Sequence, residues 1–150
     1  MINRSDEVKK YLFIFVIAVF LLLTLSVKDN INPPYLSISS GDVSIMAVTG
    51  NYVWTEDSIS IEVDTDNPTD IVKYQQKTLV VNSGDVLNLV FKKNPVDVQV
   101  NIWKNNKIIE QELYNNKLIV PYGLGDLVYE VIVNYDQGTV HYAFVIIVNY

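Results

Sequence analysis

The sequence predicts an all-β protein, with an antiparallel β-sandwich at residues 36–150 that is preceded by one N-terminal transmembrane helix. Three observations lead to this prediction. Residues 11–27 form an uncharged apolar run, apolar and polar residues alternate through most of the chain after residue 35, and turn-forming residues separate the alternating stretches. Alternation is the spacing of side chains along a strand, and no useful apolar pattern with a helical period follows residue 27.

The apolar run reads YLFIFVIAVFLLLTLSV. Because hydrocarbon offers no water to backbone groups, a lone spanning segment has to be a helix. At about 1.5 Å per residue the run spans roughly 25 Å, at the short end for a hydrocarbon core of about 30 Å. Arg4, Lys9 and Lys10 precede the run, whereas only Lys28 follows it closely. The positive-inside rule then predicts a single-pass protein of the cell membrane, with residues 1–10 as a cytoplasmic tail and the C-terminal domain extracellular.

A cleaved signal peptide is the alternative for the same residues. The apolar run exceeds the roughly 7–15 residues of a signal-peptide core, and Thr24-Leu25-Ser26 lacks the A-x-A character of a cleavage site. We therefore expect a retained anchor that contacts the lipid bilayer through residues 11–27. A short stalk at 28–35 follows, which Pro33 and Pro34 stiffen.

The alternating stretches predict eight or nine short strands, each with one apolar face. The expected inward residues are Ile59, Ile61 and Val63; Leu87, Leu89 and Phe91; Val96, Val98, Val100 and Ile102; Leu127, Tyr129, Val131, Val133 and Tyr135; and Tyr142, Phe144, Ile146 and Val148. Turns are expected at 40–42 and 83–85, at Asn105-Asn106 as a two-residue hairpin loop, and at 136–138 as a three-residue loop with Gly138 in the left-handed region. Since Val145 and Ile147 are apolar too, the last strand is expected to be central and covered on both faces.

Composition excludes several classes of function. The chain has 150 residues, no cysteine and a formal net charge of −6. Zero cysteine excludes thiol catalysis, cysteine-bound zinc and iron–sulfur clusters, and the acidic outer domain argues against nucleic acid. The single histidine, His141, has no partner visible in the sequence for a triad or a multi-histidine metal site, and no nucleophile or phosphate-loop motif occurs. We expect no enzyme activity and no cofactor, with a carboxylate-dependent hydrolase as the remaining enzymatic alternative.

An acidic stretch is the candidate metal site. Asp64, Asp66 and Asp70 offer hard oxygen ligands with a spacing that partly suits a calcium loop. However, Pro68 replaces the third ligand of such a loop, and Gln75 stands at its twelfth position. A solvated acidic loop after a strand is therefore the favoured interpretation, and calcium is the alternative.

Aromatic residues are the candidate partner-binding site. Tyr52 and Trp54 share one face of their predicted strand, and Trp103 falls on the polar face of another. An exposed tryptophan or tyrosine gives a rigid contact surface for a protein or a glycan. We expect Trp54 in the core, and we name Trp103 and Tyr52 as the partner-binding candidates, with burial in the core as the alternative for Trp103.

Several short motifs carry a resemblance. They are the G-x-Y-x-W element at residues 50–54, Asp-Asn-Pro at 66–68, and the stretches 81–85, 94–98 and 129–148. Together they resemble small extracytoplasmic domains of Gram-positive bacteria that follow a lipoprotein or membrane anchor. The resemblance covers most of residues 44–148, although the chain lacks the cysteines of many such domains. It implies an immunoglobulin-like sandwich outside a bacterial cell, and it assigns no site residue.

These observations together favour a binding function. We expect a membrane-anchored extracytoplasmic interaction module without catalytic activity, which contacts another envelope or membrane protein. The alternative is a ligand-sensing module for cell-wall glycan or calcium.

Overall fold

The computed structural model describes residues 13, 15–16, 31–105 and 107–149. The chain divides into two compact units, residues 1–30 and residues 31–150. Phe13, Phe15 and Val16 are helical, and the rest of the expected tail and anchor, with residues 28–30 of the expected stalk, lies outside the described residues. Within the described part of the chain, no helix has the length and apolar character needed to cross a membrane.

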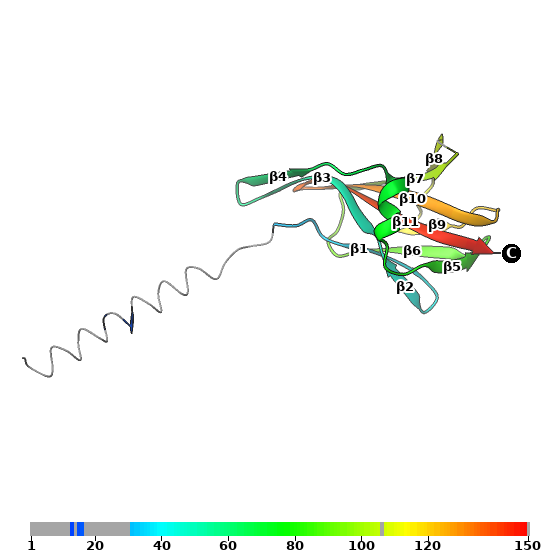
Figure 1. Cartoon of the computed structure of the whole chain (residues 1–150), viewed down its shortest axis with the longest axis horizontal. Coiled ribbons are helices and arrows are strands. Elements are labelled where there is room, and N and C mark those ends of the chain that lie inside the picture. The colour runs from blue at the N-terminus through cyan, green and yellow to red at the C-terminus, as the bar shows by residue number, and fades with distance from the viewer. Residues whose placement is uncertain (1–12, 14, 17–30, 106, 150) are drawn as a thin grey trace, which may run out of the picture. The chain divides into compact units, whose positions relative to one another are not determined.

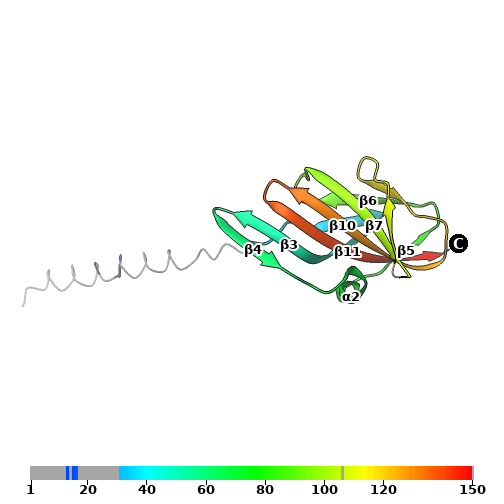
Figure 2. The same ribbon diagram turned by 90° about the horizontal axis from the view of Figure 1, so that it is seen from above.

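Residues 31–150 form two β-sheets, as shown in Figures 1 and 2. The smaller sheet has the order β2 (Val43–Met46), β1 (Leu36–Ser40), β6 (Val86–Phe91) and β9 (Lys117–Ile119). The larger has the order β4 (Ile59–Val63), β3 (Val48–Glu56), β11 (Gly138–Asn149), β10 (Gly125–Tyr135), β7 (Asp97–Lys104) and β8 (Lys107–Gln111), with β5 (Leu79–Asn82) beside β11. All pairs are antiparallel except β5 with β11. The all-β prediction is confirmed, and the two sheets are consistent with a β-sandwich.

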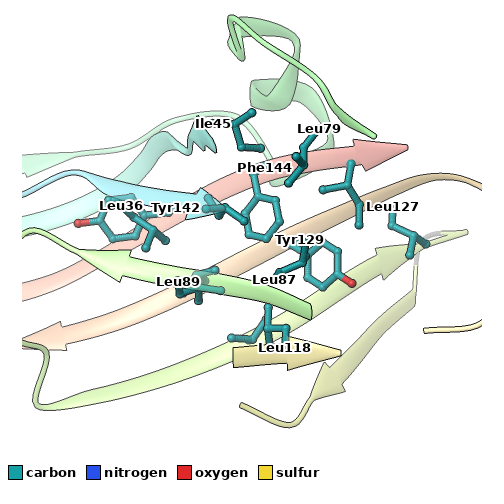
Figure 3. Packing of buried hydrophobic residues seen from close by; sticks show 14 of the residues in the cluster. Leu36, Ile45, Leu79, Leu87, Leu89, Leu118, Leu127, Tyr129, Tyr142 and Phe144 are labelled. Atoms are coloured by element: carbon teal, nitrogen blue, oxygen red, sulfur yellow. The ribbon is translucent and has the colours of Figure 1, made fainter. Parts of the chain in front are cut away.

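The core lies between the two sheets, where apolar side chains from both meet (Figure 3). Every predicted inward residue of β10 and β11 is buried, and so are Leu87 and Leu89 of β6. Tyr129 stacks on Phe144 with ring centroids 4.8 Å apart. Two residues of the predicted inward sets are exposed. Ile59 lies at the end of edge strand β4 with 54% of its surface exposed, and Val96 precedes β7 with 69% exposed.

The loop between β10 and β11 differs from the prediction. Tyr135 pairs with Gly138, so the loop has two residues and Gly138 belongs to the strand. Gly138 has φ of +146°, and a Cβ there would overlap the Val53 carbonyl oxygen of β3. Only glycine allows this approach of two backbones. The other expected turns are present, and Lys104 pairs with Lys107 across the predicted two-residue loop at 105–106.

Strand β11 is the centre of the larger sheet. One edge pairs with β10 through residues 138–148, while the other edge pairs with β3 through residues 138–143 and with β5 through residues 146–149. The Gln75 side chain fills the gap between β3 and β5. Its Oε1 accepts a hydrogen bond from the Val145 N–H at 2.8 Å, and its Nε2 donates to the Val145 carbonyl at 2.9 Å. A side-chain amide thus satisfies the backbone groups that a paired strand would otherwise satisfy.

A short helical segment covers part of the outer face of the larger sheet. It consists of α2 (Pro68–Ile71) and a 3-10 turn (Val72–Tyr74), and it packs against β3, β10 and β11 (Figure 2). The sequence predicts only a loop here, because four residues are too few for a visible helical period. Ile71 of α2 and Ala143 of β11 are both buried and line the same cavity, so the central strand is covered on both faces in this region.

The described part of the expected stalk belongs to the folded unit. Residues 31–35 form neither helix nor strand, and Ile31 packs against the core. The Tyr142 hydroxyl donates to the Pro34 carbonyl at 2.5 Å. The chain is therefore tied to the sandwich before β1 begins.

Candidate functional site

A polar network occupies the outer face of the larger sheet, at the centre of three adjacent strands. Glu130 of β10 pairs directly with Asn101 of β7, and Trp103 and His141 lie one diagonal position away on β7 and β11. Directly opposed and diagonal residues share one face of a sheet. The antiparallel register therefore brings together four side chains from three strands.

Glu130 is the acceptor at the centre of this network. The Nδ1 atom of His141 lies 2.9 Å from its Oε1, and the Trp103 indole Nε1 donates to its Oε2 at 2.9 Å. Asn101 donates to the same Oε2 at 3.4 Å, and its own Oδ1 accepts a bond from Gln99 at 3.3 Å. Glu130 is only 7% exposed. A carboxylate this far from water is stable only with such donors.

The donors decide the charge of Glu130. Burial by itself raises the pKa of the carboxyl. Hydrogen bonds from His141, Trp103 and Asn101, together with the charge of a protonated His141, outweigh burial and hold the pKa below its usual value of 4.5. Glu130 is thus ionised at neutral pH, and its negative charge lies just beneath the surface on the outer face of the larger sheet.

The network forms one wall of a cavity of about 140 Å³. Trp103, Glu130 and His141 line it on the sheet side, and residues 65–68 with Ile71 line it on the other. A second cavity of about 100 Å³ adjoins it, with Glu62 and Asp64 in its wall. Asn51 and His141 line both cavities. The two cavities are therefore neighbours on either side of these two residues.

Asn51 holds the opposite wall in place. Its Oδ1 accepts hydrogen bonds from the Thr65 N–H at 2.6 Å and from the Thr65 hydroxyl at 2.8 Å. The register of β3 against β11 shifts at this point, so that Gly50 and Asn51 together oppose His141. A Cβ on Gly50 would lie 3.1 Å from the Ile71 Cδ1 atom. The glycine therefore permits the close approach of α2 to the sheet.

The structure places the residues of the G-x-Y-x-W element in different surroundings. Gly50 faces α2, and Trp54 lies in the core, 2% exposed, as its pattern predicts. Its ring meets Tyr135 edge-to-face at 5.5 Å. Tyr52 is half-buried against the core and is among the residues that line the second cavity.

The two partner-binding candidates are not brought together as one surface. Trp103 is partly exposed at the first cavity with its N–H bonded to Glu130, whereas Tyr52 borders only the second. Trp103 is therefore neither a core residue nor a freely exposed one. Its indole is held in a fixed orientation beside the cavity.

The structure brings two of the three aspartates of the acidic stretch together. Asp66 lines the first cavity and Asp64 the second, and both line a third cavity of about 500 Å³. Asp70 lies on α2 and lines none of the three. Among the described residues, no three acidic, histidine or cysteine side chains come close enough to hold a metal ion.

The chemistry of the network suits recognition. His141 has its Nδ1 engaged with Glu130, which leaves Nε2 as the ring atom for contact with another molecule. Within the described residues, the hydrogen bonds of His141 include no serine or threonine hydroxyl that it could activate as a nucleophile.

Sequence reasoning missed Glu130. A signal was present, because a charged residue interrupts the outward apolar positions Val128 and Ile132 of a long strand. A two-residue loop at 136–137 would also have paired residue 132 with His141, and so placed Glu130 beside it. The predicted three-residue loop implies a different register, so the sequence did not place Glu130 beside His141.

No protein-family model matches the chain, and no curated protein sequence matches it.

Proposed function

We propose that the chain is a membrane-anchored interaction module without catalytic activity, on the extracytoplasmic side of a bacterial cell membrane. Residues 11–27 are its single-pass anchor, residues 1–10 are cytoplasmic, and residues 31–150 form an immunoglobulin-like sandwich outside. Its partner is another envelope or membrane protein, and nucleic acid is not a partner. The uncharged run and the cations before it support the anchor and its orientation.

One observation carries the binding function. The Trp103 indole is fixed by a 2.9 Å hydrogen bond to the nearly buried Glu130 carboxylate, and Trp103 lines the first cavity on the outer face of the larger sheet. Pre-orienting an aromatic side chain lowers the entropy cost of binding. Tryptophan beside a desolvated pocket is also the residue type that dominates binding energy at interfaces.

A photo-crosslinking experiment tests this proposal. A benzoylphenylalanine side chain is placed at Asn67, on the wall of the first cavity, in the full chain in its native membrane. We expect one discrete protein adduct, and we expect Trp103→Ala to reduce it strongly while the melting temperature shows that the domain is folded. The matched control carries the same crosslinker at the exposed Glu110 of β8. Equal adducts from both positions, or an Asn67 adduct that ignores Trp103→Ala, would contradict the proposal.

A cell-wall glycan is the second candidate partner. Trp103, Asn51 and Asn67 line the same small cavity. An aromatic ring with adaptable polar groups is suited to a sugar. Calcium is less well supported, because Asp70 does not join Asp64 and Asp66 in the cavity that those two line, and no three acidic or histidine side chains of the described residues come close enough to hold a metal ion. A pull-down of the full chain with purified cell wall, compared with Trp103→Ala, separates the glycan from the protein partner.

A further inference from the structure

We propose that edge strand β4 pairs with β4 of a second copy of this chain, so that the larger sheets of two copies join at this edge. β4 is the outermost strand of its sheet, and among the strands that the structure describes it pairs with β3 alone (Figure 2). The inference concerns this edge and not the Trp103 network, so it goes beyond the proposed function and is tested separately from it.

The backbone of β4 offers hydrogen-bonding groups along its free edge. The β3–β4 hairpin turns through residues 57–58, which both have positive φ, so Glu56 and Ile59 form the hydrogen-bonded closing pair. Since hydrogen-bonded pairs alternate along an antiparallel ladder, the N–H and C=O groups of Ser60 and Glu62 point away from β3. Within the described residues these four groups have no hydrogen-bond partner. A strand of another chain can satisfy all four at once.

The side chains of β4 form an apolar row that the sandwich covers only in part. Ile59, Ile61 and Val63 share the core-side face, because Ile61 pairs directly with the buried Trp54 and alternate residues of a strand share one face. Nevertheless Ile59 is 54% exposed, and Ile61 and Val63 are only half-buried. Covering this row with a second apolar row would remove apolar surface from water, which is favourable.

The sequence of β4 is complementary to itself. In an antiparallel pairing centred on Ile61, residue 59 of each copy meets residue 63 of the other, and Ser60 meets Glu62. The apolar side chains then meet on one face, and on the other face each carboxylate meets a serine. The outward backbone groups also face each other in this register. A register that brought the two Glu62 side chains together would place like charges directly opposite, which is destabilising.

The opposite edge of the larger sheet is less suited to such pairing. β8 begins with Lys107, and an antiparallel pairing centred on Ile109 would place Ile108 against Glu110. Lysine, proline and bulges are the features that commonly protect an edge strand. β4 contains neither lysine nor proline, and its register against β3 has no shift.

The contact is small. β4 supplies five residues, whereas a standard interface has roughly 20–30 residues a side. We therefore expect a weak dimer that forms where copies are concentrated. Attachment to one membrane, as proposed above, would raise the effective concentration of the copies.

A disulfide test is direct because the chain has no cysteine. Ile61→Cys is made in the full chain, in its native membrane, and copper phenanthroline is added as the oxidant. In the proposed register the two thiols face each other at a non-hydrogen-bonded pair, where Cα atoms are about 4.5 Å apart and within reach of a disulfide. We expect a disulfide-linked dimer. In the control Ile59→Cys the two thiols lie four residues apart along the strands, roughly 13 Å, and should not link.

A second pair of variants leaves the apolar row intact. Ser60→Cys and Glu62→Cys, at exposed positions, are made in separately tagged copies. The mixture should form a linked dimer, and neither variant alone should, because residue 60 meets residue 62 only between copies. This test keeps the inference falsifiable if Ile61→Cys lowers the melting temperature.

Charge at position 60 tests the register. In the Ile61→Cys background, Ser60→Glu places a carboxylate opposite Glu62 and should reduce the dimer about two- to tenfold. Ser60→Lys places an ammonium group there and should keep or raise the dimer yield, with melting temperatures showing that both variants are folded.

Three outcomes would overturn the inference. They are no more dimer from Ile61→Cys than from the exposed Ile108→Cys on β8, as strong a link from Ile59→Cys, or equal effects of the two charges at position 60. A failed dimer with an Asn67 adduct that still depends on Trp103 refutes the pairing of β4 and leaves the interaction module standing.

Discussion

At the scale of the residue, Glu130 links stability to pH. Its pKa is lower in the folded protein than its usual 4.5, so folding releases protons from this group in the acid range. The stabilisation is complete above the usual carboxyl pKa, and it is lost as the pH falls through the lower pKa of the folded state. Acid unfolding should therefore begin with the loss of this network.

Replacing the carboxyl tests that link. In Glu130→Gln we expect a free energy of unfolding that varies less between about pH 6 and pH 3 than in the parent protein, because the titrating group is gone. Urea unfolding at several pH values measures it. Glu110→Gln, which removes an exposed carboxyl from β8, is the matched control and should leave the pH dependence near that of the parent. Identical curves for the parent and Glu130→Gln would rule out this role.

Two core tyrosines form a second residue-scale comparison. Among the described residues the buried Tyr129 hydroxyl has no hydrogen-bond partner, whereas the Tyr142 hydroxyl donates to Pro34. Burial raises the pKa of both phenols. We expect Tyr129→Phe to be neutral or to stabilise by about 1 kcal/mol, and Tyr142→Phe to destabilise by about 1 kcal/mol. Urea denaturation of both variants measures the contrast, and equal losses would show that the Tyr129 hydroxyl has a partner in solution.

At the scale of the element, Gln75 acts as part of the sheet. Replacing it with alanine leaves the Val145 N–H and carbonyl without partners between β3 and β5. An unsatisfied partly buried group costs about 1–3 kcal/mol, so Gln75→Ala should destabilise by that amount. It should also speed the exchange of the Val145 amide hydrogen. The exposed neighbour Gln76 provides the control, since Gln76→Ala should change neither quantity by much. Unchanged exchange at Val145 would show that the contact is not maintained.

At the level of single elements, the sequence predicted those strands in which apolar and polar residues alternate several times. The alternation in β10 and β11 identified their buried faces because each has the length to show the pattern several times. It could not reveal α2, which has four residues, or the parallel pairing of β5. The local sequence shows neither α2 nor the parallel pairing of β5. Both depend on the path that residues 64–82 take along the larger sheet.

At the scale of the whole molecule, the candidate site depends on register rather than motif. Asn101, Trp103, Glu130 and His141 come from three strands, and only the pairing of β7, β10 and β11 brings them together. Sequence reasoning singled out Trp103 and His141 separately, and it had no partner for either. The role of such a single residue can be interpreted once the strand order is known. Neither composition nor residue spacing gives that order.

Strand order also determines when the domain can be completed as the chain emerges. β11 occupies the middle of the larger sheet and is the final strand from the N-terminus. Until β11 has emerged, β3, β5 and β10 each lack a neighbour, and their open backbone edges are exposed to other chains. A polypeptide delivered N-terminus first would therefore need protection until β11 is available, and a chain truncated before β11 should be prone to associate with other chains.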